Sequence, residues 1–430
     1  MIKKRVFLII LSLVFSAFLS SQLRIEIKGG LEDPINIAIV PFQWNLKTPQ
    51  QESIQKVIQS DLESFGEYAV LSPENMLSLP SRAEEVFFKD WRILGSDFLV
   101  IGEVNSLEEP TEMLVNYLIF DVVRERIIHR GKVIGPIVTQ RKMAHKISDK
   151  IYSKTQGIPG IFSTKIAYID KPSDLNPAYN LMISDIDGFD SLSLFSSPQP
   201  LMSPSWSTDM KKIAYVSFEE GSSRIYIQEL ATAERIGLKQ EEGINSSPNW
   251  SPDGKKMSAV LSKSGNPDIH IYDFKQSRWI QLTNHFGIDT EPDWSPDSNK
   301  LIFTSNRSGS PQIYELNVKS KKVKRLTFEG SYNARARYLP NGKEIVFVHR
   351  RNGIFHIATQ NIKTGKIKIL TNTTLDESPT VSPNGNVVIY ATKDGEKDIL
   401  AGVTIDGRTK FTMPSMKGEA REPSWSPLID

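Results

Sequence analysis

The stretch SPNWSPDGKK, residues 247–256, recurs with small changes as SPSWSTDMKK at residues 203–212 and as EPDWSPDSNK at residues 291–300. The aromatic residue of this motif returns every 44 residues, with one step of 43. Its positions are Trp206, Trp250, Trp294, Tyr338 and Trp425, with Val381 in the one remaining place. A fixed period of this length indicates a repeated structural unit.

Each repeat predicts a small antiparallel sheet. It holds four short segments rich in branched and aromatic residues, and turn residues separate them. The SPDG sequence Ser251–Gly254 predicts a type I turn between the first two strands, since its proline fixes φ and its glycine follows the bend. Thr208, Met210 and Ser298 replace turn residues in other copies. The run Leu301–Phe303 is apolar at successive positions, so we expect both faces of each sheet to be covered.

Repeated sheets of this length, packed face to face around an axis, form a β-propeller. The motif occurs six times, but the chain ends at Asp430, soon after the sixth copy. At residues 165–170, KIAYID looks like a second strand with no motif before it. We therefore expect Glu422–Ser426 to supply the innermost strand of a blade whose other three strands come from residues 165–197. The prediction is a six-bladed β-propeller over residues 159–430, closed by its C-terminal strand.

The N-terminus has the pattern of a secretory signal peptide. Three cations at positions 3–5 precede an apolar run, Val6 to Leu19, and small residues follow it. The run is short for a membrane span, although a retained anchor is the alternative. The chain has no cysteine, which argues against a lipoprotein anchor and disulfide bonds. We expect residues 1–21 to be removed, leaving a soluble periplasmic protein without a membrane span that begins near Gln22.

Residues 22–158 predict a small α/β domain that precedes the propeller. Strand-like segments occur at residues 35–42, 98–104 and 113–123, and helical spacing at residues 49–66 and 139–157. Ser72-Pro73-Glu74 predicts the start of a further helix. Basic residues on the helix at 139–157 are interpreted as its solvated face: Arg141, Lys142, Lys146, Lys150 and Lys154.

The motif tryptophans are interpreted as packing between blades, because a large ring buries well and its N–H needs only one partner. The residues just before the motif vary while their surroundings repeat. They enter the innermost strands, so we expect them to line one mouth of the central channel, where variable side chains on a rigid scaffold suit binding. A solvated rim without a partner is the alternative. These residues are Ser246, Ser247, Asp289, Thr290, Glu291, Arg335, Asp376, Glu377, Arg421 and Glu422.

Several function classes are disfavoured. The 52 Lys and Arg residues nearly balance the 50 Asp and Glu residues, so nothing favours nucleic acid. The sequence has no Gly-x-Ser-x-Gly or His-Glu-x-x-His motif, and its six histidines are scattered. DIDGFD, residues 185–190, suggests a turn rather than a calcium loop. We expect no enzyme, catalytic residue, cofactor or metal site, with a carbohydrate-binding propeller or lyase as the alternative because Asp289 and Glu291 could hold a saccharide or metal.

The chain resembles the TolB family, periplasmic propellers of the bacterial Tol-Pal envelope system. The resemblance rests on LRIEIKGG (23–30) with IAIVPF (37–42), the link KISDKIYSKTQGIPGIFSTKIAYI (146–169) and the six motif units, and it covers essentially the whole chain. It implies a monomeric, non-enzymatic adaptor that binds the lipoprotein Pal at the propeller mouth and TolA through its mature N-terminus. Other outer-membrane lipoproteins are possible further partners, and the implied role is outer-membrane integrity and constriction at cell division.

The resemblance also implies contact residues. Pal-contacting residues of the family precede the motif proline, which corresponds here to Ser246–Ser247 and Thr290–Glu291. The full expected Pal-binding set is Ser246, Ser247, Asp289, Thr290, Glu291, Arg335, Glu377 and Glu422. The matching TolA-binding segment is Gln22, Leu23, Arg24, Ile25, Glu26 and Ile27, an alternating strand able to pair with a partner edge or to pack back on its own domain.

Overall fold

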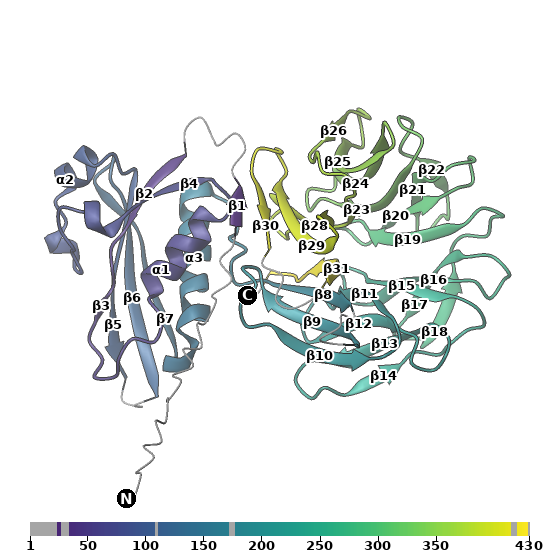
Figure 1. The fold of residues 1–430 in the computed structure, drawn as a ribbon, viewed down its shortest axis with the longest axis horizontal. Coiled ribbons are helices and arrows are strands. Elements are labelled where there is room, and N and C mark those ends of the chain that lie inside the picture. Colours follow the sequence, from purple (N-terminus) through teal and green to yellow (C-terminus); the bar gives the residue numbers. More distant parts are fainter. Residues whose placement is uncertain (1–23, 27–33, 108–110, 172–176, 414–418, 429–430) are drawn as a thin grey trace, which may run out of the picture.

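The computed structural model describes residues 24–26, 34–107, 111–171, 177–413 and 419–428 (Figure 1). An α/β domain lies beside a ring of six four-stranded sheets, as the sequence predicts. The predicted signal peptide at residues 1–21 lies outside the described residues. Within the described ranges, no helix combines the length and the apolar character needed to cross a membrane.

The N-terminal domain is built on one mixed sheet with the order β4-β2-β5-β6-β7, and β3 also pairs with β5. β2 pairs in parallel with β4 and β5, whereas β5, β6 and β7 are antiparallel. The sequence predicted β2, β5 and β6 but missed β4 and β7; β7 is half exposed and so lacks a continuous apolar run. The strands are β2 (Ile35–Ile39), β3 (Gln43–Trp44), β4 (Tyr68–Leu71), β5 (Phe98–Ser106), β6 (Glu112–Asp121) and β7 (Arg126–Pro136).

Both faces of this sheet are covered by helices. α1 (Ile54–Glu63) and α3 (Gln140–Gln156) pack on one face, and α2 (Phe88–Ile93) packs on the other. The two long helices agree with the predicted helical spacing. The helix expected at Ser72-Pro73-Glu74 was wrong in extent, because only the 3₁₀ turn η1 (Pro73–Asn75) forms and Met76 returns to extended backbone. Two further 3₁₀ turns are η2 (Ala83–Glu85) and η3 (Ile137–Thr139).

Each propeller blade is an antiparallel sheet of four strands. The blades are β31-β8-β9-β10 (Glu419–Trp425, Lys165–Lys171, Tyr179–Asp185, Leu192–Ser197), β11-β12-β13-β14 (Leu201–Trp206, Lys212–Ser217, Arg224–Glu229, Arg235–Gly237), β15-β16-β17-β18 (Asn245–Trp250, Lys256–Leu261, Asp268–Asp273, Arg278–Gln281), β19-β20-β21-β22 (Asp289–Trp294, Lys300–Ser305, Gln312–Asn317, Val323–Arg325), β23-β24-β25-β26 (Asn333–Tyr338, Glu344–Arg351, Ile354–Asn361, Ile367–Ile369) and β27-β28-β29-β30 (Glu377–Val381, Val387–Asp394, Lys397–Thr404, Lys410–Thr412).

The C-terminal strand closes the ring, which confirms the prediction. β31 pairs antiparallel with β8, with Trp425 opposite Ile166. The Lys165 amide donates to Ser426 Oγ at 2.9 Å, and the Ser426 amide donates to the Lys165 carbonyl at 2.9 Å. The indole of Trp425 donates to Thr164 Oγ1 at 2.7 Å. The two ends of the propeller sequence therefore form one blade, and closing the ring in this way removes exposed sheet edges.

The motif turn has the expected geometry. The Gly254 amide donates to the Ser251 carbonyl at 2.8 Å, and the Ser251 hydroxyl donates to Asp253 Oδ1 at 2.6 Å. Met210 and Ser298 occupy the position of the glycine with φ values of 56° and 58°. These residues therefore keep the left-handed backbone conformation of the glycine, which strains the backbone slightly.

The tryptophans pack between blades, as predicted. The indole of Trp206 donates to the Ser424 carbonyl at 3.0 Å, and that of Trp294 to the Asn249 carbonyl at 3.1 Å. In both pairs the acceptor lies on the innermost strand of the neighbouring blade. Trp250 differs, because its indole N–H has no hydrogen-bond partner in the described part of the chain and its ring stacks on Phe274, with the ring centroids 4.9 Å apart.

The two domains share one continuous apolar core. The rings of Phe65, just after α1, and Phe411, on the outermost strand β30, lie 5.5 Å apart. Asn386 donates to the hydroxyl of Tyr152 on α3 at 3.1 Å. β1 (Arg24–Glu26) pairs antiparallel with the free edge of β30, with Ile25 opposite Phe411 (Figure 1). The N-terminal segment thus pairs with the propeller and not, as one expectation held, with its own domain.

We expect the Trp425→Ala substitution to destabilise the propeller strongly. Trp425 is 7% exposed and joins β31 to the start of the first blade, so truncation leaves a cavity at the closure and costs about 3 kcal/mol. The matched control is Phe286→Ala, whose ring is 86% exposed and whose loss changes stability by less than about 0.5 kcal/mol. Guanidinium denaturation of both variants measures the difference, and equal midpoints would contradict closure through Trp425.

Candidate binding site at the propeller channel

Every innermost strand carries a bulge at the same place. In each of the six strands two consecutive residues lie opposite a single residue of the neighbouring strand, so the register shifts by one. The first of the two has a left-handed backbone, with φ between 50° and 56°. Non-glycine residues rarely adopt this conformation, and six in a ring form a systematic feature of the fold. We call these residues the bulge ring: Ser203, Ser247, Glu291, Arg335, Ser378 and Glu422.

The bulge ring lines the central channel and is held by charged contacts. Arg335 Nε lies 2.8 Å from Glu291 Oε1, and the Arg335 guanidinium also donates to Ser378 Oγ. Partial burial opposes the charge of Arg335, but Glu291, then Glu422 and Glu377, raise its pKa above the ordinary value. The ring therefore presents one cation among carboxylates.

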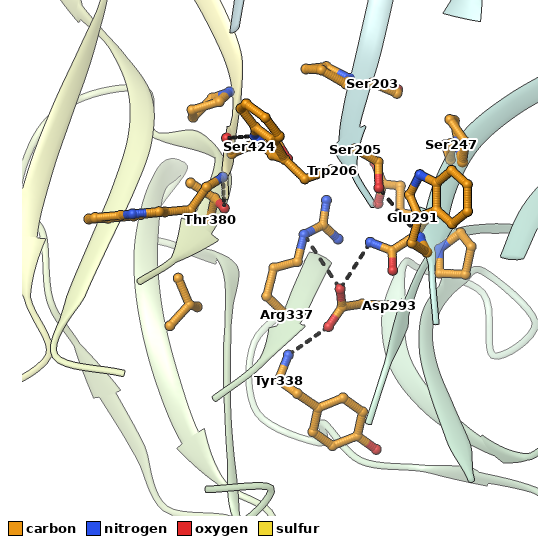
Figure 2. Close-up of a pocket in the computed structure, with 18 of the residues that line it drawn as sticks. Ser203, Ser205, Trp206, Ser247, Glu291, Asp293, Arg337, Tyr338, Thr380 and Ser424 are labelled. Atoms are coloured by element: carbon orange, nitrogen blue, oxygen red, sulfur yellow. Dashed lines mark hydrogen bonds and ion pairs between the residues drawn. The ribbon is translucent and has the colours of Figure 1, made fainter. Parts of the chain in front are cut away.

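A cavity of about 570 Å³ occupies the channel from the bulge ring to the motif turns (Figure 2). Between the ring and the turns, polar side chains bind the next blade. Asp293 accepts a hydrogen bond from the Tyr338 amide at 2.9 Å and one from the Asn249 side chain at 3.2 Å, and Arg337 lies 3.9 Å away. Burial raises the pKa of Asp293 despite these contacts. This layer fixes the blades relative to one another, so the channel wall is rigid.

Eight of the ten predicted site residues fall into two groups. Ser247, Glu291, Arg335 and Glu422 belong to the bulge ring and line the cavity. Half-buried positions one residue before the bulge are occupied by Ser246, Thr290, Glu377 and Arg421, and Arg421 Nε donates to Asp398 Oδ2 at 2.6 Å.

Asp289 does not face the channel. Its side chain is fully buried, accepts a hydrogen bond from Ser305 at 2.6 Å and pairs with Arg307 at 2.6 Å. Asp376 is equally buried and accepts a hydrogen bond from Thr392 at 2.8 Å. Both acids hold loops at the mouth through these contacts, so the expectation that their side chains line the channel was wrong, while a role of Asp289 in Pal binding stays a prediction.

Sequence analysis missed two groups of residues at the channel. Ser203 and Ser378 complete the bulge ring, and the 44-residue period could have identified them as the residues before a motif proline. The second group is a set of exposed apolar side chains on the loops that lead into the innermost strands. We call it the apolar rim: Ile244, Phe286, Ile288, Phe328 and Leu375. Phe286 is 86% exposed and Phe328 is 75% exposed, which is typical of a surface that binds a partner.

Comparison with known families matches both halves of the chain. A model described as the TolB amino-terminal domain matches residues 23–128, and one described as the TolB beta propeller domain matches residues 152–429. The chain belongs to the TolB family. Members of this family are β-propeller components of the Tol-Pal system and are not enzymes.

Similar proteins extend over the full length. The Tol-Pal system protein TolB of Marinomonas sp. (strain MWYL1) is 56% identical over 431 residues, covering 100% of both chains. The protein of that name from Hahella chejuensis is 56% identical over 431 residues, covering 99% of both. The crystal structure of TolB from Acinetobacter baumannii has 39% identity and a TM-score of 0.86, and it covers 95% of this chain and 100% of that chain.

We expect Asp289→Asn to lower stability because it leaves the Arg307 guanidinium without its buried partner, at a cost of about 3 kcal/mol. The matched control is Glu377→Gln, which removes a half-buried carboxylate at the mouth and changes stability by less than about 0.5 kcal/mol. Chemical denaturation compares the two variants. If Asp289→Asn proved as neutral as the control, its carboxylate would have no structural role.

Proposed function

We propose that the protein is a periplasmic adaptor of the Tol-Pal system. The lipoprotein Pal binds at the channel mouth formed by the apolar rim and the bulge ring, and TolA engages the mature N-terminal segment. In this role the protein supports outer-membrane integrity and constriction at cell division. Family membership supports the proposal, and the bulge ring together with the apolar rim, which lies on the loops of four neighbouring blades, is the observation that carries it.

The chemistry of the mouth suits a folded protein partner. Exposed aromatic rings at Phe286 and Phe328 offer large contact areas with little loss of side-chain entropy. Below them, Glu291, Arg335 and Glu422 offer both charge signs, which a partner can match with polar groups. The inter-blade hydrogen bonds keep this surface preorganised, so binding requires little ordering of the protein itself.

The N-terminal segment supports a second contact. Among the described strands β1 pairs with β30 alone, and an extended segment of this kind can exchange that pairing for a partner's strand. We propose that the segment is docked on β30 in one state and free for TolA in the other, with Pal at the mouth biasing the choice. Gln22, Leu23 and Ile27 of the proposed TolA segment lie outside the described residues.

The Pal site is tested with alanine variants at the rim. Phe286→Ala and Phe328→Ala should each weaken binding of the periplasmic part of Pal about tenfold, because each removes an exposed aromatic anchor. The control is Phe87→Ala, a side chain 67% exposed just before α2 on the other domain, which should leave the affinity unchanged. Isothermal titration calorimetry measures the dissociation constants.

Charge reversal by Glu291→Lys should also weaken Pal binding, since it places a second cation beside Arg335. Wild-type protein that fails to bind Pal at micromolar concentration would instead favour a carbohydrate-binding propeller.

The coupling of the two contacts is tested by deleting residues 22–27. If docking of the segment on β30 and Pal binding bias each other, the truncated protein should bind Pal with a changed affinity, by about fivefold or more. Thermodynamic reciprocity then requires Pal to change TolA affinity for the full chain by the same factor. Identical Pal affinities for the two forms would rule the coupling out.

A further inference from the structure

A buried group of charged side chains joins the two domains at a place remote from the channel. His145 on α3 is 2% exposed and lies between Asp61 on α1 and Asp187 in the turn that links β9 to β10. The DIDGFD segment therefore forms a turn, as predicted. Arg141, expected on the solvated face of α3, was wrongly assigned, because its guanidinium pairs with Glu52 and Asp187 at the domain interface.

The histidine faces a carboxylate at each ring nitrogen. Nδ1 lies 2.8 Å from Asp61 Oδ2, which also accepts the hydroxyl proton of Ser148 at 2.6 Å. Among the described residues Nε2 has no hydrogen-bond partner within normal distance, and Asp187 Oδ2 lies 3.6 Å from it. A neutral imidazole would carry a proton on only one nitrogen and would leave a lone pair facing a carboxylate. The geometry suits the doubly protonated imidazolium.

The surrounding charges favour the cation. Burial opposes the charge of His145, but Asp61, followed by Asp187 and Asp185, raises its pKa to about 9. Further charged groups of this cluster are Arg141 on the same helix, Glu52 before α1, Asp149 one turn further along α3, and Lys165, which pairs with Asp185. The two cations Arg141 and His145 thus lie among several carboxylates. Protonation of His145 brings the net charge of the cluster closer to zero.

The same three side chains bring metal-ligand atoms within 4.8 Å of one another, but they suit a proton better than a metal ion. Asp61 contacts the Nδ1 edge of the ring, so only Nε2 and Asp187 could share a metal. The Arg141 guanidinium already binds the same oxygen of Asp187. A divalent cation would have to lie beside this fixed charge with two protein ligands, which is a poor site.

We propose that protonated His145 clamps α1 and α3 to the closing blade and thereby holds the N-terminal strand β1 in its docked position. The connection runs through α1. Asp61 lies in the last turn of that helix, and Phe65 follows it and packs on Phe411. Phe411 belongs to β30, and its position in the ladder is opposite Ile25 of β1. The clamp and the docked strand are therefore two ends of one interface.

This arrangement makes the interface a conformational device. When the clamp is closed, α1 keeps Phe65 against β30 and the edge of β30 stays aligned with β1. When the bridge is broken, the two carboxylates repel each other and α1 can move relative to the propeller. The clamp acts on β1 indirectly, through α1, Phe65 and β30, without touching it. The inference does not depend on which partner takes up the released segment.

The protonation state is tested on the wild-type protein by ¹H–¹⁵N NMR of its imidazoles. His145 should remain doubly protonated at neutral pH and titrate near 9, above the ordinary value of 6.5. Because the folded-state pKa is raised, the stabilisation from His145 is fully present below pH 6.5 and is lost as the pH rises through about 9. Titration at or below 6.5 would overturn the clamp.

The link to β1 is tested by hydrogen exchange of the amides of residues 24–26 at pH 7. His145→Gln and Asp187→Asn should each lower their protection about tenfold, because both remove the ionic contact between His145 and Asp187. The matched control is Asp190→Asn in the same turn, whose carboxylate is 54% exposed and lies 3.9 Å from Lys142. It should leave the protection unchanged.

Each outcome of the exchange experiment decides the proposal. Asp187→Asn leaves His145 and Asp61 in place and removes the contacts of Asp187 with His145 and Arg141, so it remains informative if His145→Gln fails to fold. Protection of residues 24–26 that is the same in Asp187→Asn and in wild type would overturn the proposal. Equal losses in Asp187→Asn and in the Asp190→Asn control would also overturn it, because the effect would then come from the turn and not from the bridge.

Discussion

The pairing of β31 with β8 is the constraint on which the rest of the structure depends. Each blade is a sheet with apolar side chains on both faces, and such a sheet is stable only when neighbouring sheets cover it. An open array of blades would leave two faces and two edges uncovered. Because residues from the two ends of the propeller sequence share one blade, every blade has two neighbours, and the channel acquires a wall of six innermost strands.

That wall explains the character of the candidate site. Side chains such as Asp293, together with the motif tryptophans, bond each innermost strand to the next blade. A strand held in this way can sustain an unfavourable backbone at Ser203, Ser247 and the other bulge positions, because the surrounding structure fixes it. The bulge turns side chains of differing chemistry into the channel at equal heights. The repeat therefore supplies the geometry, while the individual residues supply the recognition.

The second domain is attached through a mixed interface. Its apolar part, around Phe65 and Phe411, continues the core of both domains, while its polar part is the buried cluster around His145. Apolar contacts tolerate small displacements, whereas a buried imidazolium between two carboxylates requires all three groups at once. The polar cluster thus defines the orientation of the two domains more closely than the apolar contact alone would. Both parts of the interface position β30, the strand with which β1 pairs.

The sequence by itself determined the six-bladed ring, its closure, the motif turns and the packing role of the tryptophans. These features can be predicted without a structure because the same residue types recur about every 44 residues. The same period located four of the six bulge-ring residues. The burial of Asp289 and Asp376, the docking of β1 on β30 and the cluster around His145 were decided only by the tertiary structure. Each depends on residues that are far apart in the chain and occur once, such as Arg141 and Asp187. The sequence does not distinguish a charged residue that is exposed to solvent from one that is buried in an ion pair. That difference arises only when the domains pack together.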